Sequence, residues 1–362
     1  MKTTILMTSE KQRGFSLVEL MVAMTIGFVI LAGIGYLYLE SRQSFRAMDN
    51  LSRMQESARY ALEVMSRDIR MAGYRGCASS TGDFHNTLNT SSASAYNFAL
   101  PLNGYDYDVV AADWAPALPT DTGGLSTLKL LAGTDAIILR SATGGGTSVT
   151  KQPGGNSSAD LQITTPNDLA INDIVMVSNC KASTVFQVTN KNVNGTNQNV
   201  VHNAGAGTPG NASQDLVENY AASGGEIIKM QSKTYFIRES ASSTAANKRY
   251  SLWQFDNYKV AAGGGDNPAE IADGVENMQI LYGIDTDGDG VINDSAGYVK
   301  ASAVTNWNQV AAIRISLLVA GSDDNVATAA QTYTYDGASV TAGDKRLRQV
   351  FTTTVSVRNR TQ

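Results

Sequence analysis

One carboxylate lies at the start of a long apolar stretch near the N-terminus, and it is the residue with the clearest potential for specific chemistry. After Glu19, residues 20–39 contain no charged side chain, and the next one is Glu40. Transfer of an unpaired carboxylate into the hydrocarbon core of a membrane costs about 2.5–3.5 kcal/mol on insertion scales. The position of Glu19 therefore predicts either a positively charged partner inside the membrane or a protonated side chain near the membrane surface.

A second group of polar residues has the spacing of a loop that binds a cation. In chain order, the candidate ligands are Asp285, Asp287, Asp289, the backbone carbonyl of Val291, Asn293 and Asp294. Calcium takes six to eight oxygen ligands, and alternate positions of a loop with a glycine at the sixth place supply them. Gly290 has that place, but Ala296 stands where an EF-hand has its bidentate glutamate, so Asp294 would have to compensate. The pattern predicts a calcium site, with a solvated Gly-rich connection as the alternative.

The two cysteines, Cys77 and Cys180, are the other candidates for covalent or metal chemistry. An even pair in an oxidising compartment predicts one disulfide, and the alternatives are two free thiols or a metal pair. The only histidines are His85 and His202, and neither is close in sequence to a cysteine, which makes a zinc site a poor interpretation. We expect the disulfide to tie the region around Cys77 to the middle of the chain.

The sequence offers little support for catalysis or for nucleic-acid binding. It contains no Gly-x-Ser-x-Gly elbow, no P-loop and no His-Glu-x-x-His motif, so we predict that the protein is not an enzyme. The net charge of −5 gives no general reason to expect DNA or anionic lipid as a partner. Basic residues near the C-terminus are interpreted as the solvated face of a strand rather than as a DNA-binding patch; they are Lys345, Arg346, Arg348, Arg358 and Arg360.

The apolar stretch that follows Glu19 is long enough to cross a membrane. About twenty residues in helical form span roughly 30 Å, which is the thickness of the hydrocarbon core. Lys2, Lys11 and Arg13 precede the stretch, and basic residues remain on the cytoplasmic side. The chain beyond about residue 40 is therefore expected outside the inner membrane. Met7 is an alternative start to Met1.

The helical pattern continues beyond the apolar stretch. Apolar residues recur three and four positions apart at Phe45, Met48, Leu51, Met54, Ala58, Ala61, Leu62, Met65 and Ile69. This spacing is typical of one face of an amphipathic helix. Oppositely charged residues lie four apart in the pairs Asp49–Arg53, Arg59–Glu63 and Glu63–Arg67. Since Gly73 is a typical stop signal, we predict one helix from Phe15 to about Ala72, roughly 85 Å long.

The chain beyond Cys77 has the patterns of strands and loops. Short strands are predicted at 128–131 and 136–140, and paired strands at 174–178 with 185–189 and at 234–238 with 250–255. Alternation is clearest in the C-terminal third, with predicted buried positions at Met278, Ile280, Tyr282, Ile284, Ile313, Ile315, Leu317, Val319, Leu347, Phe351, Val355 and Val357. Residues 79–96 are predicted to be a loop, and 142–160 and 191–215 mobile Gly/Asn/Ser-rich loops.

These elements together predict an α+β fold, in which a long N-terminal helix packs on an antiparallel β-sheet. The expected organisation is a helix over 15–72, with its transmembrane part at 15–39, followed by an extracytoplasmic β-rich globular domain over 73–362.

The sequence from Arg13 to Leu20, RGFSLVEL, resembles the class III signal of type IV pilins and pseudopilins. In that family a prepilin peptidase cuts after the glycine, and the new N-terminal residue is methylated. The resemblance implies that residues 1–14 are a leader, that cleavage falls between Gly14 and Phe15, and that Phe15 becomes N-methylphenylalanine. It also implies that Glu19 pairs with the free amine of Phe15 on a neighbouring subunit and so sets the axial stagger between subunits.

Four further segments resemble the PilW family of minor pilins: 68–77, 274–285, 310–319 and 351–360. This resemblance implies a low-abundance subunit that primes assembly of the type IV pilus, on which twitching motility depends, and that sits at or near the pilus tip. The implied partners are other minor pilins, the major pilin, a tip-associated adhesin and the inner-membrane assembly platform. The implied location is a single pass through the inner membrane with a periplasmic C-terminal domain, followed by assembly into the pilus at the cell surface.

Two alternatives remain open from the sequence. A J-like minor pseudopilin of a type II secretion system has much of the same pattern. A tip-exposed module would instead use its loops, at 79–96 and 142–215, to contact a surface, DNA or an adhesin.

Overall fold

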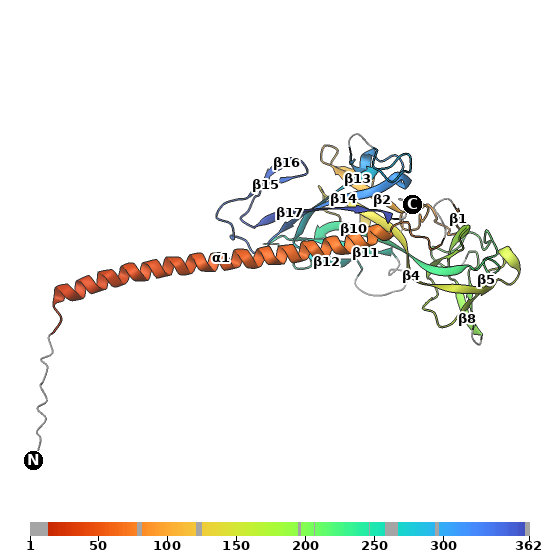
Figure 1. The fold of residues 1–362 in the computed structure, drawn as a ribbon, viewed down its shortest axis with the longest axis horizontal. Helices are drawn as coiled ribbons and strands as arrows, with labels where there is room; N and C mark the ends of the chain where they lie inside the picture. Colours follow the sequence, from red (N-terminus) through yellow and green to blue (C-terminus); the bar gives the residue numbers. More distant parts are fainter. Residues whose placement is uncertain are drawn as a thin grey trace, which may run out of the picture.

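The computed structural model contains one long helix and a β-rich region packed around the C-terminal half of that helix (Figure 1). Helix α1 runs over Leu17–Met71, and its N-terminal half projects away from the rest of the molecule. The structure describes residues 14–358, apart from 78–81, 121–124, 195–196, 206, 246, 258–266 and 294–296. The predicted α+β class, with a long N-terminal helix and a mostly antiparallel sheet region, is confirmed.

The strands form a large sheet, a small sheet and a separate hairpin. The large sheet contains β1 (Asp83–Asn86), β2 (Leu102–Asp108), β3 (Asp113–Ala115), β4 (Ala136–Lys151), β5 (Asp160–Thr164), β6 (Ile174–Ser178), β7 (Ala182–Gln187), β8 (Asn190–Asn194), β9 (Asn197–Val201), β10 (Glu226–Glu239), β11 (Tyr250–Asp256) and β12 (Ala269–Asp273). The small sheet has the order β13 (Val275–Ile284), β14 (Val310–Ala320), β17 (Arg348–Ser356), and the hairpin pairs β15 (Thr332–Tyr335) with β16 (Ala338–Thr341). Short 3-10 helices are η1 (Leu125–Thr127), η2 (Gly155–Ser157), η3 (Ala301–Ala303) and η4 (Trp307–Gln309).

Both ends of α1 are defined by local sequence. At the N-terminus Ser16 and Glu19 form a capping box, in which each side chain accepts from the backbone N–H of the other. At the C-terminus the helix ends at Met71, and Gly73 follows with φ at +75°. Glycine adopts this left-handed conformation without the steric cost that a Cβ atom would add. The predicted helix therefore agrees with the observed one to within two residues at each end.

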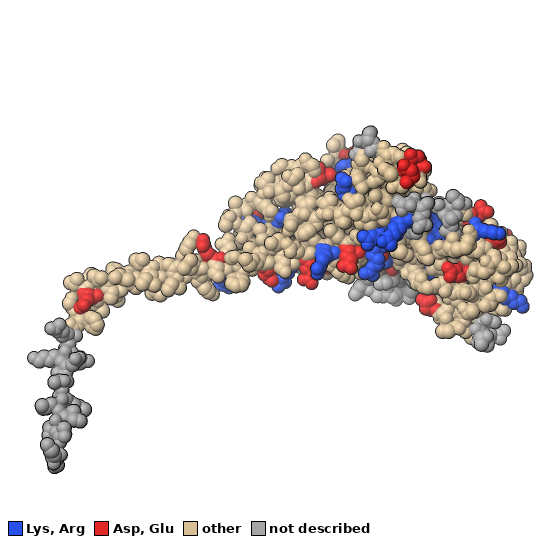
Figure 2. Space-filling model, viewed as in Figure 1, with Lys and Arg blue, Asp and Glu red and all other residues tan. Residues whose placement is uncertain are grey.

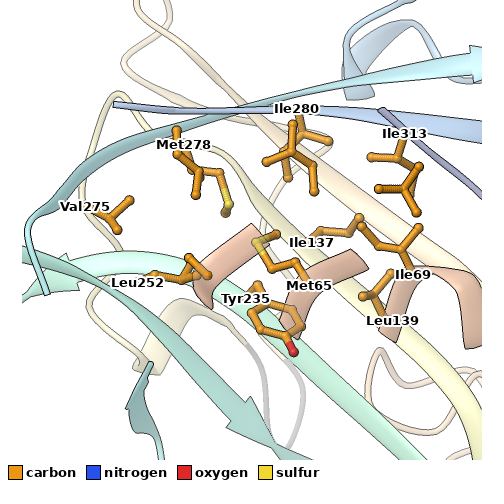
Figure 3. Close-up of a cluster of buried hydrophobic side chains, with 14 of the residues drawn as sticks. Met65, Ile69, Ile137, Leu139, Tyr235, Leu252, Val275, Met278, Ile280 and Ile313 are labelled. Carbon is orange, nitrogen blue, oxygen red and sulfur yellow. The ribbon is translucent and has the colours of Figure 1, made fainter. Parts of the chain in front are cut away.

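The main core lies between the two sheets, and one stripe of α1 packs into it. The buried apolar residues of that stripe are Met54, Ala58, Ala61, Met65 and Ile69. Figure 3 shows Met65 and Ile69 between Met278 and Ile280 of the small sheet and Tyr235 of the large sheet. Full burial of a large apolar side chain contributes about 1.5–3 kcal/mol. The helix thus joins the two sheets, since it contacts β12 and β4 of one and β14 and β17 of the other.

A charged network within this contact also holds α1 on the large sheet. Asp68 is buried, with 8% of the residue exposed, and Lys233 Nζ donates to its two carboxylate oxygens at 3.1 and 2.9 Å. The hydroxyl of Tyr235 donates to Asp68 Oδ2 at 2.5 Å, and Gln254 Nε2 donates to that hydroxyl at 2.5 Å. Burial, together with the charge of Asp68, raises the pKa of Tyr235 far above its ordinary value, so the phenol remains a donor. The network attaches the helix to β10 and β11.

A second part of the β-rich region, the distal lobe, lies at the opposite end from the N-terminus of α1 (Figure 1). It consists of β1, β5 to β9, the second half of β4 and the first half of β10. Its own apolar core includes Leu161, Val177, Phe186 and Val200. Cys77 and Cys180 form the predicted disulfide, with a sequence separation of 103 residues. The disulfide joins the segment just after α1 to the turn between β6 and β7.

The distal lobe corrects several predictions about loops. The segment at 142–160 was predicted to be a mobile loop, but β4 continues to Lys151, and η2 follows it. Likewise, 191–215 contains β9 and most of β8, which pair with each other. The predicted loop at 79–96 contains β1, which pairs in parallel with β7. These strands are rich in polar residues and, in β4, in glycine, so their side chains lack the apolar alternation that predicts a strand.

Other strand predictions are confirmed, with one exception. The pairs at 174–178 with 185–189 and at 234–238 with 250–255 correspond to β6–β7 and β10–β11. The alternating positions of β13 and β14 face the core as expected, including Met278, Ile280 and Ile313. The segment 128–131 is not a strand; η1 and an irregular connection occupy this region.

A buried carboxylate connects β2 and β13 at the end of the core. Asp135 is 2% exposed, and its oxygens accept from the backbone N–H of Tyr107 at 3.3 Å and of Ile280 at 2.8 Å. Burial raises the pKa of Asp135 from 3.8 to about 7, and the nearby Asp106 adds to the effect. The folded protein therefore holds a proton here that the unfolded chain would release at lower pH.

We expect the free energy of unfolding to include a component from Asp135 that falls as pH rises from about 4 to about 7. In this window the native state binds the extra proton, so rising pH favours the unfolded state, by at most about 1.4 kcal/mol per pH unit. Urea unfolding across this range measures the slope. Asp135→Asn cannot titrate and should lose this component, whatever its own stability. The same pH slope in both proteins would contradict the assignment.

Candidate assembly interface

The projecting half of α1 presents an apolar surface that nothing in the described chain covers. The most apolar part of the helix is long enough to span a membrane, and none of it is buried. Phe15 is 86% exposed, Phe28 is 67% exposed and Leu31 is 65% exposed. Figure 2 shows this arm as a continuous uncharged surface between the first acidic side chain and the next. A surface of this size in a stable protein needs either lipid or another protein around it.

The residues of the predicted processing site lie at the tip of this arm. Gly14, Phe15 and Ser16 precede the first turn of α1 and are exposed. The leader residues before Gly14 lie outside the described part of the chain. Phe15 therefore stands at the end of the helix, where a new N-terminal amine would be accessible.

Glu19 is held by local contacts only. Its backbone N–H donates to Ser16 Oγ at 3.3 Å, and Ser16 N–H donates to Glu19 Oε2 at 3.4 Å. The second of these bonds is long, so the carboxylate keeps most of its capacity to accept from a stronger donor. Phe15 stands four positions before Glu19, which in ideal helical geometry corresponds to a rise of about 6 Å. If the N-terminal amine of a neighbouring subunit paired with Glu19, the two parallel helices would be offset along their axes by little more than one helical turn.

The amphipathic face predicted beyond residue 44 is only partly used by the core. Phe45 is 70% exposed, Met48 is 66% exposed and Leu51 is 40% exposed, which corrects the prediction that they pack on the sheet. The first buried residue of α1 is Asn50, whose side-chain oxygen accepts from the backbone N–H of Asp323 at 3.1 Å. Spacing alone indicates an apolar face but does not say whether the same chain or a partner covers it. The uncovered face continues the apolar arm towards the globular region.

Charges on the helix surface are only partly paired. Arg53 contacts Asp49 at 3.1 Å, as predicted. The other two predicted pairs are not formed: within the described residues, the side chains of Arg59, Glu63 and Arg67 make no ion pair. The i, i+4 spacing permits such pairs but stabilises them by only about 0.3–0.5 kcal/mol.

The C-terminal basic residues do not form a simple solvated face. Arg346 is 8% exposed, and the Arg348 guanidinium contacts Glu276 at 2.7 Å and Asp344 at 2.5 Å. The hydrogen bond from Arg348 lowers the pKa of Asp344. Lys345 and Arg358 are exposed, and Arg360 lies outside the described residues. The interpretation as a solvated face is therefore wrong for Arg346 and Arg348, which hold the β17 region to its neighbours.

The acidic loop after β13 brings three predicted ligands together. One oxygen each of Asp285, Asp287 and Asp289 lies within 4.8 Å of the others. Asp285 is buried and accepts from the backbone N–H of Gly288 at 2.7 Å and of Gly290 at 2.9 Å, so the first position is fixed by the loop itself.

The remaining predicted ligands are less well placed. Asn293 closes the loop, because its amide donates to Asp287 at 2.9 Å and its oxygen accepts from Thr286 N–H at 2.9 Å. The first of these bonds lowers the pKa of Asp287. Val291 is 61% exposed, and Asp294 lies outside the described residues. The carboxylates of Asp285, Asp287 and Asp289 form an oxygen donor set of the kind that suits a hard cation.

A single exposed apolar helix with a carboxylate in its first turn, joined to an antiparallel sheet region, defines the pilin-like class of membrane-anchored subunits. The family model described as the prokaryotic N-terminal methylation motif matches residues 10–35, which contain Gly14, Phe15 and Glu19. The family model of PilW, described as type IV pilus-assembly protein W, matches residues 234–359. The two matches lie in separate parts of the chain, and both support its similarity to PilW-family, type IV pilin-like proteins. Comparisons with curated proteins and with solved structures gave no significant match.

Proposed function

We propose that this protein is a minor pilin that helps to prime assembly of the type IV pilus and is incorporated at or near the pilus tip. The observation that carries the proposal is the uncovered apolar arm of α1, with a single carboxylate in its first turn. Such an arm fits two environments in succession, the inner membrane before assembly and the helical centre of a filament afterwards. The role is structural, and packing between helices is the activity.

The proposed docking contact is the Glu19 carboxylate of one subunit with the N-terminal amine of Phe15 on its neighbour. The attraction between unit charges grows as the dielectric constant falls, so an amine in the apolar arm is a stronger partner than the Ser16 N–H. Two unpaired charges in the same surroundings would each carry a large desolvation cost. Cleavage after Gly14 would create the amine, and so make assembly dependent on the prepilin peptidase.

The arrangement of the molecule also suggests its partners and location. The N-terminal arm would cross the inner membrane once, with the globular region in the periplasm. The distal lobe lies at the far end from the arm, which favours a place where an outer face remains exposed (Figure 1). Other minor pilins, the major pilin and the assembly platform would contact the helix, and a tip-associated adhesin would contact the distal end.

Deletion of the gene, followed by complementation, tests the proposal. We expect few or no surface pili and reduced twitching in the deletion strain, and recovery of both on complementation. In the complemented strain, the protein should be detected in sheared pili and by labelling at pilus ends. Normal pili together with loss of protein secretion would instead assign the chain to a type II secretion system. Normal pili with lost attachment would favour a tip-exposed adhesion module.

We also propose that the acidic loop after β13 binds calcium, with Asp285, Asp287 and Asp289 as the central ligands. Three carboxylates that lie within 4.8 Å of one another repel unless a cation compensates them. Asp294, Asn293 and the Val291 carbonyl would complete the oxygen set.

Removal of calcium by a chelator should lower the melting temperature of the full-length protein by several degrees, because a ligand that binds only the folded state stabilises it. Addition of calcium in excess should restore the original value. Asp287→Asn/Asp289→Asn should melt at the same temperature with and without chelator. An unchanged melting temperature of the wild type on chelation would contradict the site.

A further inference from the structure

A basic groove lies between the C-terminal part of α1 and β17, at the edge of the main core, against which its lining residues Leu62 and Phe351 pack. Its volume is about 670 Å³. The lining residues that matter here are Arg59, Arg67, Arg70, Arg358, Leu62 and Phe351. Figure 2 shows Lys and Arg side chains gathered on this face, near the C-terminal end of α1. We call this surface the basic groove.

The helix arginines of the basic groove are not used within the chain. The side chains of Arg59, Arg67 and Arg70 are exposed and make no hydrogen bond or ion pair with the described residues. Among the described residues that line the groove, Glu63 is the only acidic one. By contrast, Arg348 in the same strand region is bound by two carboxylates. Three guanidinium groups therefore present free, planar donor forks to a partner, a geometry that suits carboxylates or phosphates.

The apolar lining of the basic groove helps to choose between these two anions. Leu62 and Phe351 are half-buried and leave an apolar strip between the arginines, and Met71 is 39% exposed beside them. An amphipathic protein segment would cover this strip and pair its acidic side chains with the arginines. A nucleic acid would be repelled by the overall negative charge of the protein, which is −5. The observations thus favour an acidic protein segment over a nucleic acid.

The proposed helix pairing points to the source of this segment. A contact between Phe15 of one subunit and Glu19 of the next offsets the two helices by only about 6 Å. Residues 55–71 of one subunit would then lie at nearly the same position along the helix axes as the equivalent residues of its neighbour. The basic groove lies on the surface of this helix segment and would face the globular region of the adjacent subunit.

We propose that the basic groove binds an acidic, apolar-faced segment of the adjacent pilin-class subunit, and that this contact fixes the rotation of neighbouring subunits about their helices. The inference rests on the proposed assembly function, because the helix pairing supplies the neighbour. It adds a second contact, outside the membrane, whose chemistry differs from that at Glu19. The helix pairing would set the axial offset, and the groove would select which subunit lies beside this one.

Photo-crosslinking in piliated cells tests the proposal. A benzophenone amino acid at Ser66, which lines the groove, should crosslink to a peptide rich in Asp and Glu from another subunit with a prepilin N-terminus. Arg67→Glu/Arg70→Glu should reduce the crosslink by about tenfold, since charge reversal replaces attraction with repulsion. Replacing the captured acidic residues by arginine should restore it. Lys151→Glu/Lys181→Glu makes the same charge change on exposed residues of the distal lobe and should leave the crosslink unchanged.

Three results would overturn the proposal. One is the absence of a crosslink at Ser66 in cells with normal pili, and another is a crosslink that the arginine reversals do not alter. The third is binding of the full-length protein in detergent to a short DNA duplex, if it weakens steeply with salt and is lost in the reversal variant, because a nucleic-acid site would then explain the arginines. In each case, a Glu19→Ala variant that still blocks assembly would leave the proposed function standing.

Discussion

Replacement of Glu19 by alanine should remove the protein from pili while leaving its globular region folded. Among the described residues, the Glu19 side chain makes one hydrogen bond, which it accepts from the backbone N–H of Ser16 at 3.4 Å on the exposed tip of α1. Its loss therefore removes at most about 0.5–2 kcal/mol of helix capping, far from the core. In the assembled state, however, the same change would leave the N-terminal amine of a neighbour without a counter-charge in an apolar environment, at a cost of several kcal/mol.

The measurement is the amount of protein in sheared pili relative to the amount in the inner membrane. A matched control is Glu40→Ala, which removes an exposed carboxylate at the other end of the apolar stretch, where it accepts from the Tyr36 hydroxyl at 2.7 Å. We expect near-complete loss of incorporation for Glu19→Ala, and a much smaller change for Glu40→Ala. Incorporation of Glu19→Ala at the wild-type level would contradict the proposed pairing of Glu19 with the N-terminal amine of a neighbouring subunit.

Replacement of Asp68 by alanine should cost about 3–5 kcal/mol of unfolding free energy, because it breaks a buried ion pair and leaves one partner behind. The side chain of Lys233 is only 20% accessible, so its ammonium group would lose its counter-charge in a largely buried position. Tyr235, whose hydroxyl donates to Asp68, would lose its acceptor at the same time. The result should be weaker attachment of α1 to the large sheet.

Urea unfolding of the full-length protein in detergent measures this effect. Asp49→Ala is the matched control, since it removes an exposed helix ion pair that is worth only about 0.3–0.5 kcal/mol. The double variant Asp68→Ala/Lys233→Met should recover part of the loss, because it removes the stranded charge. A loss below about 1 kcal/mol for Asp68→Ala would show that the network does not hold the helix.

Features defined by short-range patterns were predictable from the sequence. The helix from the capping residue Ser16 to the stop at Gly73 follows from spacing, charge and end signals. The pairing of Cys77 with Cys180 follows from a count of two cysteines in a part of the chain that is predicted to lie outside the cytoplasm. Strands β13, β14 and β17 of the C-terminal third alternate clearly enough to be predicted from the sequence, although Leu347 and Phe351 are only half-buried and the β15–β16 hairpin was not predicted.

Features that depend on tertiary contacts were not predictable in the same way. The polar strands β8 and β9 are held by pairing with neighbouring strands rather than by an apolar face. Their own residues therefore predict a loop. Phe45 and Met48 continue the apolar spacing, yet both remain largely exposed, at 70% and 66%. The Asp68 network had a signal that was overlooked, namely a charged residue between Met65 and Ile69 on the buried stripe of the helix.

The central claim is that an apolar helix with a charged N-terminus is the working part of this protein. Intact mass spectrometry of the native protein, purified from cells with an active prepilin peptidase, tests it most directly. The account predicts a mature chain that begins at Phe15 and carries one added methyl group on its amine. A chain that retains Gly14 and the residues before it would contradict the account.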